Sequence, residues 1–322
     1  MEKTQSVYEY FIGFDVSKDS VTAHNSRTGI TEDIENDPLS LRRYVKQLDG
    51  ECLAICEPTG GYEAALLDVL VATSIPAHRA DARKVKAFMR SLGIYGKTDA
   101  IDARALAEYG KERHIRLSLW SAPDVMRQEL QALVARRQEL TALQTAERNR
   151  SKAPITGRKA GQHVKASCLR MLKAITREIK KAEDAIAAII EADERLQEME
   201  VVLRSVKGIG PAIASTLLAC MPELGTLSRR QAASLAGLAP HPRQSGKIQG
   251  YRRISGGRRE VKRALFMAAL VASRHNTKMK IFYKRLIENG KKPIVALTAL
   301  MRKIITILNA KIRDYRENIQ MS

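Results

Sequence analysis

The stretch Phe11-Ile-Gly-Phe-Asp15-Val16 decides the fold, because an apolar run ends there on a carboxylate. Its pattern predicts a buried strand over residues 8–16. Residues 20–26 and 31–35 predict two shorter strands, separated by the turn residues Arg27-Thr-Gly29, so the chain opens with an antiparallel meander. A carboxylate at the end of a buried strand is costly unless a cation compensates its charge. Asp15 is therefore the first candidate site residue.

Helices and parallel strands are expected to alternate after this meander. The patterns predict a helix over 38–48, a strand over 52–57, a helix over 62–72, a strand over 75–79, a basic helix over 81–91 and a last helix starting near Asp99. Asp37 suits the N-cap of the first helix and Pro38 its first position. This is the element order of a ribonuclease-H-like α/β domain. In that order the first strand, the fourth strand and the final helix converge at one edge of the sheet.

Two further motifs supply carboxylates to that edge: Leu53-Ala-Ile-Cys-Glu57-Pro-Thr-Gly-Gly-Tyr62 and Lys97-Thr-Asp99-Ala-Ile-Asp102-Ala. Asp99 and Asp102 are three residues apart, so a helix presents both on one face. Magnesium prefers oxygen ligands, and two such ions roughly 4 Å apart can stabilise the attacking and leaving oxygens of a phosphodiester displacement. The four carboxylates therefore predict a Mg²⁺ site for phosphoryl transfer on nucleic acid. The alternative is that Asp99 and Asp102 only charge a helix N-terminus.

The charge is unevenly distributed along the chain. The net charge is +20, yet residues 1–120 carry 16 Lys and Arg against 18 Asp and Glu, whereas residues 201–322 carry 24 against 5. A strongly basic region predicts a polyanionic partner, because neutralising phosphates releases counterions. A membrane surface would also attract it, but we find no signal peptide and no apolar run of about 20 residues. Nucleic acid is the better interpretation.

The cysteines and the length limit the remaining possibilities. Cys52, Cys56, Cys168 and Cys220 show no C-x-x-C spacing, which argues against a zinc site or a disulfide framework and favours reduced thiols in a cytoplasm. The six histidines form no ligand cluster in the sequence. We expect a catalytic domain over 1–120, a helical connector over 121–204 and a basic C-terminal domain over 205–322.

The connector is predicted to form two long amphipathic helices. Its apolar residues recur at helical spacing within polar sequence, at Leu130, Leu133, Leu140 and Leu143 and later at Leu172, Ile175, Ile179, Ile186, Ile189 and Ile190. The pattern breaks at Lys152-Ala-Pro-Ile-Thr-Gly157. Such arms are typical of coiled-coil assembly between subunits. An intramolecular helical pair is the alternative.

The C-terminal region carries two motifs suited to DNA. Val206-Lys-Gly208-Ile-Gly210-Pro211 precedes an apolar helix and resembles a helix-hairpin-helix clamp, in which glycines let backbone N–H groups approach a phosphate. Ser245 follows in a Gly- and Pro-rich loop, where it could be only a hydrogen-bond donor to phosphate. The predicted nucleic-acid contacts are Lys207, Gly208, Gly210, Arg243, Lys247, Arg252, Arg253, Arg258, Arg259, Lys262 and Arg263.

The whole chain resembles the DEDD-type transposases of bacterial insertion sequences, the IS one-ten family, whose relatives include the Piv-type DNA invertases. The N-terminal motifs that match its RuvC-like domain are Gly13-Phe-Asp15-Val-Ser-Lys18, Cys56-Glu57-Pro-Thr-Gly-Gly-Tyr62 and Lys97-Thr-Asp99-Ala-Ile-Asp102-Ala-Arg104. The C-terminal motifs that match its transposase domain are Gly208-Ile-Gly-Pro211, Gly237-Leu-Ala-Pro240, Arg243-Gln-Ser245-Gly246 and Arg263-Ala-Leu-Phe-Met-Ala-Ala-Leu270. The stretch from Ile254 to Asn276 is closer to the IS eleven-eleven branch.

The resemblance implies specific roles. Asp15, Glu57, Asp99 and Asp102 would bind two magnesium ions, and Ser245 would be the nucleophile that forms a phosphoserine link to DNA. A structured non-coding RNA, the bridge RNA, would pair with donor and target DNA. The active centre would combine two half-sites, and we expect a dimer that becomes a tetramer on RNA and DNA, in the bacterial cytoplasm at the nucleoid.

Two other functions compete with a recombinase. A RuvC-like junction endonuclease would hydrolyse DNA with the same carboxylates and would not need Ser245. A non-enzymatic nucleic-acid scaffold would need neither. All four carboxylates are retained, which argues against a scaffold, and the Ser245 motif with the long helical arms favours a recombinase over a nuclease.

Overall fold

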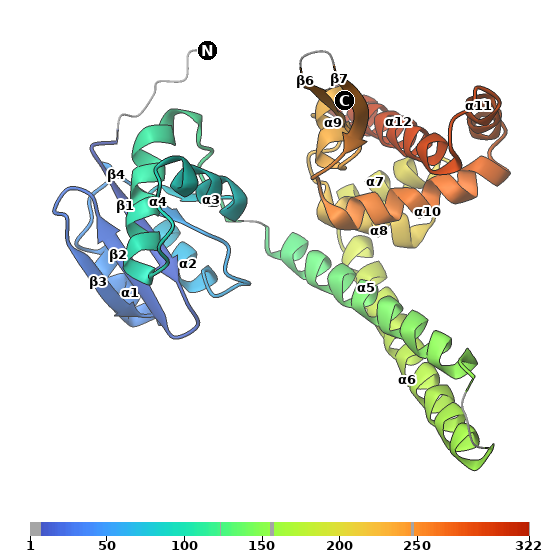
Figure 1. Ribbon diagram of the computed structural model, residues 1–322, viewed down its shortest axis with the longest axis horizontal. Coiled ribbons are helices and arrows are strands. Elements are labelled where there is room, and N and C mark those ends of the chain that lie inside the picture. The colour runs from blue at the N-terminus through green and yellow to red at the C-terminus, as the bar shows by residue number, and fades with distance from the viewer. Residues whose placement is uncertain (1–7, 123, 155–157, 246–247, 322) are drawn as a thin grey trace. The chain divides into compact units, whose positions relative to one another are not determined.

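The computed structural model describes residues 8–122, 124–154, 158–245 and 248–321 (Figure 1). The chain forms two compact units that divide between residue 123 and Asp124. The predicted connector and the basic C-terminal region lie together in the second unit.

The first unit is built on a five-stranded sheet. Its strands are β1 (Tyr10–Val16), β2 (Ser20–Asn25), β3 (Thr31–Glu35), β4 (Cys52–Cys56) and β5 (Ala77–Arg79), in the spatial order β3-β2-β1-β4-β5. β1 runs antiparallel to β2 and parallel to β4, and β4 runs parallel to β5. The predicted strands and their ribonuclease-H-like order are confirmed.

Helices cover both faces of this sheet (Figure 1). They are α1 (Pro38–Val45), α2 (Ala64–Ala72), α3 (Ala82–Ser91) and α4 (Asp99–Arg113), followed by the short 3-10 helix η1 (His114–Arg116). On one face Ile12 and Phe14 of β1 share a core with Leu41 of α1 and Leu70 of α2. On the other face, Phe11, Leu53 and Ile55 share a core with Val85 and Phe88 of α3 and Leu106 of α4. The unit therefore has three layers.

The start of α1 confirms the predicted cap. The Asp37 carboxylate accepts the backbone N–H groups of Leu39 at 2.8 Å and Ser40 at 3.1 Å, and Pro38 occupies the first turn. The helix ends at Val45, three residues earlier than predicted. Gln47 and Leu48 then bond three residues back, with Gln47 N donating to Tyr44 O at 3.0 Å, so the chain tightens out of α geometry there.

The second unit is mainly helical. Its elements are α5 (Val125–Lys152), α6 (Arg158–Glu191), α7 (Glu194–Arg204), α8 (Pro211–Cys220), α9 (Arg229–Leu235), β6 (Pro240–Ser245), β7 (Ile248–Ile254), α10 (Arg259–His275), α11 (Thr277–Glu288) and α12 (Pro293–Met321). The two long helices predicted for the connector are α5 and α6, which lie side by side within one chain (Figure 1).

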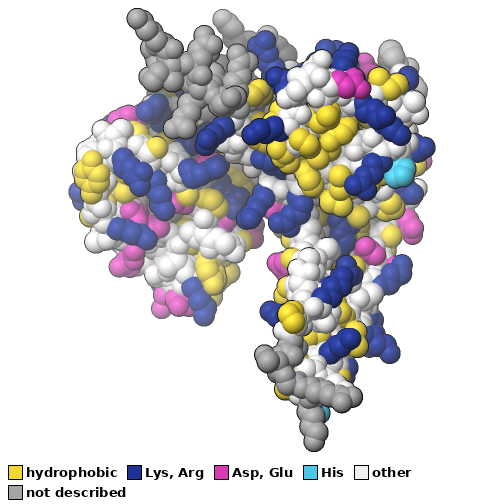
Figure 2. Space-filling model, turned by 45° about the vertical axis from the view of Figure 1, so that its right-hand side comes forward, with side chains coloured by type: hydrophobic (Ala, Val, Ile, Leu, Met, Phe, Trp, Pro, Cys, Tyr) yellow, Lys and Arg dark blue, Asp and Glu magenta, His cyan; other side chains and the backbone are white. Residues whose placement is uncertain are grey.

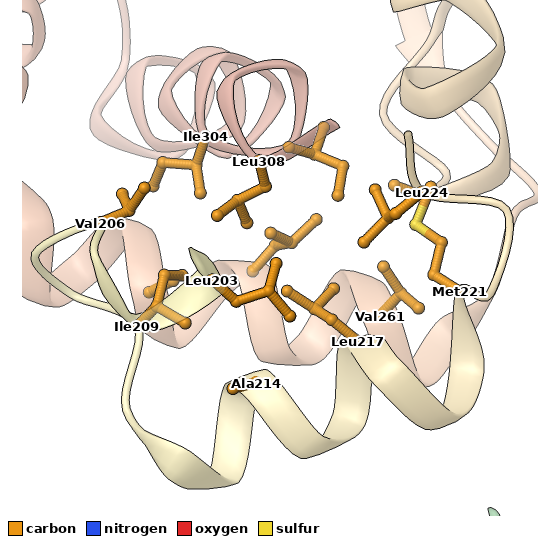
Figure 3. Close-up of a cluster of buried hydrophobic side chains, with 14 of the residues drawn as sticks. Leu203, Val206, Ile209, Ala214, Leu217, Met221, Leu224, Val261, Ile304 and Leu308 are labelled. Atoms are coloured by element: carbon orange, nitrogen blue, oxygen red, sulfur yellow. The ribbon is translucent and has the colours of Figure 1, made fainter. Parts of the chain in front are cut away.

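One apolar core joins the ends of these two long helices to the C-terminal helices. Leu203, Leu217, Met221, Ile304 and Leu308 converge in it (Figure 3). Val134 of α5 and Ile186 of α6 belong to the same core. Further along the pair, Leu140, Ile175 and Ala182 are also buried. These stripe residues are thus covered within the chain, as the intramolecular alternative predicts.

The hairpin formed by β6 and β7 corrects a prediction. Ser245 was expected in a Gly- and Pro-rich loop, but it ends β6, which pairs antiparallel with β7 and sets Ser245 opposite Ile248. Pro240 and Pro242 made the segment look irregular, because proline cannot donate to a central ladder. A two-stranded sheet tolerates them, and its register shifts between His241 and Arg243.

Helix α12 also differs from the expectation that no apolar run could span a bilayer. Residues 293–319 meet the length and composition of a spanning helix, with a mean hydropathy of 1.4. Leu300, Ile304 and Leu308 are at most 1% exposed within the core of the second unit. The apolar character of α12 is therefore explained by packing inside the protein.

Candidate active site

Strand β1 presents Asp15 to the face of the sheet that α4 covers. Alternate residues of a strand point to the same face, so Phe11, Gly13 and Asp15 share one. A Cβ atom on Gly13 would lie 1.9 Å from the carbonyl oxygen of Ala103, so α4 passes directly against this strand. The strand ends there and leaves Asp15 half-buried.

Glu57 reaches the same face from the next strand. Leu53 and Ile55 of β4 belong to the core on the α3 and α4 side, and Glu57 continues their alternation one step past the strand. β1 and β4 are parallel, with Phe14 paired to Cys56. Asp15 and Glu57 therefore follow a registered pair at the same edge of the sheet.

The first turn of α4 brings the other two carboxylates. The Thr98 hydroxyl oxygen caps the helix by accepting the N–H of Ile101 at 3.2 Å, which fixes where the helix begins. Asp99 and Asp102 then lie in the first turn, Asp99 exposed and Asp102 half-buried. The alternative role of charging a helix N-terminus is thus available to both, but it does not account for their proximity to Asp15.

The four carboxylates repel one another. Burial raises the pKa of Asp15 to about 6, and the charges of Asp102 and Asp99 add to the rise. Burial likewise raises the pKa of Asp102. The negative charge of each carboxylate thus disfavours ionisation of its neighbours, and a cation bound among them would favour their ionised forms.

Two lysines moderate this repulsion. Burial raises the pKa of Glu57, and the charges of Asp15 and Asp102 raise it further. The positive charge of Lys86 in α3 lowers it. Lys97, two residues before Asp99 in the predicted motif, opposes the rise for Asp15 and Asp102. The sequence prediction singled out neither lysine, although both belong to segments that it identified.

The donor set suits a hard cation such as magnesium. It consists of carboxylate oxygens, two of them at strand ends and two on one helix turn, and Mg²⁺ takes oxygen ligands with retained waters. Across the described ranges, no three His, Cys, Asp or Glu side chains are drawn closely enough together to form a closed ligand group. The residues fit the ion chemically, and their carboxylates lie near one another without forming a complete coordination shell.

The sequence did not predict that the buried carboxylate of Glu63 pairs with Arg79, whose side chain is 43% exposed. Glu63 is 3% exposed, and its Oε1 accepts Nη2 of Arg79 at 2.6 Å and Nε at 3.0 Å. Burial would raise the pKa of Glu63, but hydrogen bonds from the backbone and from Arg79 lower it to about 2. A sequence signal exists, since Glu63 directly follows the motif that carries Glu57, but an acidic residue before a helix is usually only a cap.

The C-terminal candidates fall into three groups. Ser245 is the last residue of β6; for Ser245, Arg243 and Arg252 the structure describes the backbone alone, and Lys247 lies outside the described residues. Exposed side chains belong to Lys207, Arg253, Arg259 and Arg263, and Lys262 is half-buried. Arg258 and the two glycines have structural partners.

Arg258 makes a two-point contact with a carboxylate. Its guanidinium donates to both oxygens of Glu223, at 2.5 and 2.6 Å, and to the carbonyl oxygen of Cys220 at 2.8 Å. It thereby ties the start of α10 to the end of α8. Its charge is engaged inside the protein.

Packing requires the glycine turn before α8. Gly208 has φ of +113°, and a Cβ there would lie 3.2 Å from the carbonyl oxygen of Ala268 in α10. Gly210 caps α8, and Pro211 takes its first position. The turn is therefore shaped by its contact with α10, whether or not it also binds phosphate.

Comparisons with known proteins extend over both units. The DEDD family of IS110, which is the IS one-ten family, is described as "Transposase" and matches residues 12–157. The family described as "Transposase IS116/IS110/IS902 family" matches residues 201–284. The first range includes all four carboxylates and the second includes Ser245.

Individual relatives agree with these matches. The pilin gene-inverting protein of Moraxella bovis is 30% identical over 268 residues, which are 81% of this chain and 80% of that protein. The insertion element IS900 uncharacterized 42 kDa protein of Mycobacterium paratuberculosis is 31% identical over 224 residues, 65% of this chain and 55% of that protein. The insertion element IS110 uncharacterized 43.6 kDa protein of Streptomyces coelicolor is 34% identical over 146 residues, 44% of this chain and 35% of that protein.

Proposed function

We propose, from the premise that this chain belongs to the IS110 family of transposases, that it is a recombinase of a bacterial insertion sequence. Such an enzyme cuts DNA and rejoins it. One relative is named for inverting a pilin gene, which is a rearrangement of DNA. The observation that carries the proposal is the meeting of Asp15, Glu57 and the first turn of α4 at one edge of the sheet.

In this proposal the four carboxylates hold Mg²⁺ in a two-metal site. The bound ions would supply positive charge to the phosphate and acidify the attacking group. Asp15 and Glu57 would contribute from the ends of rigid strands, and Asp99 and Asp102 from the first turn of a capped helix. Lys86 and Lys97 would add positive charge beside the phosphate that enters.

Ser245 would be the nucleophile. Its hydroxyl loses a proton, its oxygen bonds to phosphorus, and one bridging P–O bond of the strand breaks, leaving a free hydroxyl on the DNA. Reversal of these steps, with the hydroxyl of another strand attacking, rejoins the DNA without an external energy source. A serine needs activation to attack, which is why we place it with the carboxylates in one composite centre.

Donor and target DNA would be held by the second unit and selected by a structured bridge RNA. Most of the chain's net positive charge lies after residue 200, and Lys and Arg side chains are spread over the α5 and α6 pair and the C-terminal helices (Figure 2). Backbone contacts would come from the helix-hairpin-helix-like turn and the hairpin, with base pairing reading the sequence. Such a protein would act at the nucleoid in the cytoplasm.

The active form would be an oligomer, a dimer that becomes a tetramer on RNA and DNA. The paired helices α5 and α6 would act as its coiled-coil arms. The catalytic, connector and basic regions predicted from the sequence would then correspond to cleavage, assembly and DNA binding.

A RuvC-like endonuclease is the second candidate, and trapping the intermediate separates the two. Ser245→Ala should abolish both a covalent protein–DNA adduct and recombination, because no other hydroxyl replaces the nucleophile. Ser255→Ala, a change of the same size at an exposed position after β7, should retain both. Denaturing electrophoresis of labelled DNA with mass spectrometry of the adduct measures this outcome. Normal cleavage by Ser245→Ala would favour hydrolysis.

A further inference from the structure

The loop that carries Glu57 is folded around a carboxylate of its own. Oε2 of Glu63 accepts the N–H of Thr59 at 3.0 Å, its hydroxyl at 3.1 Å and the N–H of Gly61 at 2.9 Å. The other oxygen of Glu63 is held by Arg79 of β5. One buried side chain thus connects the loop after β4 to the neighbouring strand.

This loop has little else to fix its shape. Gly60 and Gly61 both have positive φ, +77° and +110°, and a Cβ on either would meet nothing within 4 Å. Glycines leave a chain many accessible conformations, so a loop that contains two needs a tie to stay in one. Glu63 supplies that tie with three hydrogen bonds.

A second side chain joins this loop to the end of β1. Nδ2 of Asn36 donates to the carbonyl oxygen of Ser17 at 2.8 Å and to that of Tyr62 at 3.1 Å. Ser17 lies two residues after Asp15, and Tyr62 lies five residues after Glu57. The two carboxylate-bearing segments are therefore linked across the sheet edge.

We propose that Glu63 and Asn36 are positioning residues, which hold Glu57 at a fixed place relative to Asp15 so that both carboxylates can share one divalent cation. The inference rests on the proposed metal-dependent function. Three of the hydrogen bonds that Glu63 accepts come from Thr59 and Gly61 in the loop that follows Glu57, so loss of Glu63 would act first on that loop. Neither residue touches the reacting atoms, so both act through Glu57.

The test uses the full-length chain and Mn²⁺ as the probe, because Mn²⁺ accepts the same oxygen ligands as Mg²⁺. Mn²⁺ affinity is measured by electron paramagnetic resonance, and hydrogen exchange is followed over residues 57–63 by mass spectrometry. The variants are Glu63→Gln, Asn36→Ala and Asp15→Asn. The matched control is Arg27→Gln, which breaks ion pairs with Glu9, Asp49 and Glu51 at the opposite end of β1 and β4.

We expect Glu63→Gln and Asn36→Ala each to weaken Mn²⁺ binding about tenfold, as is typical of groups that orient metal ligands, and to speed exchange in the loop. Asp15→Asn should weaken Mn²⁺ binding without changing exchange there, and Arg27→Gln should change neither. If Glu63→Gln impairs folding, Asn36→Ala still decides, because Asn36 is only half-buried.

Two results would overturn the inference. The first is unchanged exchange over residues 57–63 in both positioning variants, and the second is faster exchange with wild-type Mn²⁺ affinity. Failure of the proposed function looks different, because Asp15→Asn would then bind Mn²⁺ as the wild type does.

Discussion

At the residue scale, Asp15 is the carboxyl group whose ionisation opposes folding most clearly. Its pKa rises from 3.8 to about 6 in the folded chain. The folded state therefore binds this proton more tightly than the unfolded state. The resulting stabilisation is fully present below about pH 4 and is lost as the pH rises through about 6.

Asp15→Asn should therefore stabilise the first unit at pH 8 without divalent cations. The gain should be about 1 kcal/mol, well below the full value of the shift because the site is half exposed and screened by solvent, and it should vanish near pH 4. Urea unfolding with EDTA measures it through the single tryptophan, Trp120, which packs against the core of the first unit. Asp68→Asn on the exposed side of α2 is the control. An equal gain at both pH values would exclude charge as the cause.

Single residues also show where sequence reasoning stops. The four carboxylates could be found because each ends a strand or begins a helix, and such positions are readable from local patterns. The Glu63–Arg79 pair could not, because it joins residues sixteen apart that only the packing of β5 beside β4 brings together. Arg258 was predicted as a phosphate contact for the same reason: its charge is visible in the sequence and its partner Glu223 is not.

At the scale of elements, the contact between β1 and α4 determines where Asp99 and Asp102 lie relative to Asp15. Gly13→Ala should destabilise the first unit by about 1–3 kcal/mol or more, because the new Cβ would overlap backbone atoms of α4 that cannot rotate away. Gly50→Ala is the matched control, since a Cβ there meets nothing within 4 Å and its φ is not positive. Trp120 fluorescence in urea measures both. Equal stability of the two variants would contradict this close packing.

The elements themselves were largely predictable. Strands β1 and β4 are mostly apolar runs, and α1 and α4 begin at recognisable caps. The hairpin of β6 and β7 was not predictable, because its prolines contradict the strand pattern and its pairing partner is not visible in either strand alone. The long helices α5 and α6 were predicted, but periodicity alone could not say which surface covers their apolar stripes.

The structure changes which residues of α5 and α6 should be tested for assembly. Leu140 is 5% exposed within the chain, whereas Leu143 is 52% exposed and Met171 is 51% exposed. We expect Leu143→Asp with Met171→Asp to reduce oligomers while helicity and melting temperature stay nearly unchanged. Leu140→Asp should lower the melting temperature, because it buries a charge without a partner. Sedimentation and circular dichroism report these outcomes, and unaltered oligomers in the double variant would remove this surface from consideration.

At the scale of the whole molecule, the two units carry different chemistry. The first holds the carboxylates in a nearly charge-balanced segment, and the last 122 residues hold a net charge of +19. Recombination exchanges strands between two duplexes, so at least four cleavages must be coordinated. The proposed metal site lies in one unit and the proposed nucleophile in the other, so one chain could supply the carboxylates and another the serine, which would make activity depend on assembly.

Mixing two inactive chains tests that dependence. Asp15→Asn removes the charge of a proposed metal ligand but leaves Ser245, and Ser245→Ala leaves the carboxylates; each alone should be inactive. If Ser245 of one chain works with the carboxylates of another, mixed oligomers contain some intact composite sites and should regain part of the recombination activity. A chain that carries both substitutions, mixed with wild type in the same ratio, controls for dilution. Recombination of a two-duplex substrate is measured together with adduct formation on differently tagged chains, and the adduct should form only on the Asp15→Asn chain. Mixed oligomers that are demonstrably present but inactive would place both half-sites within one chain.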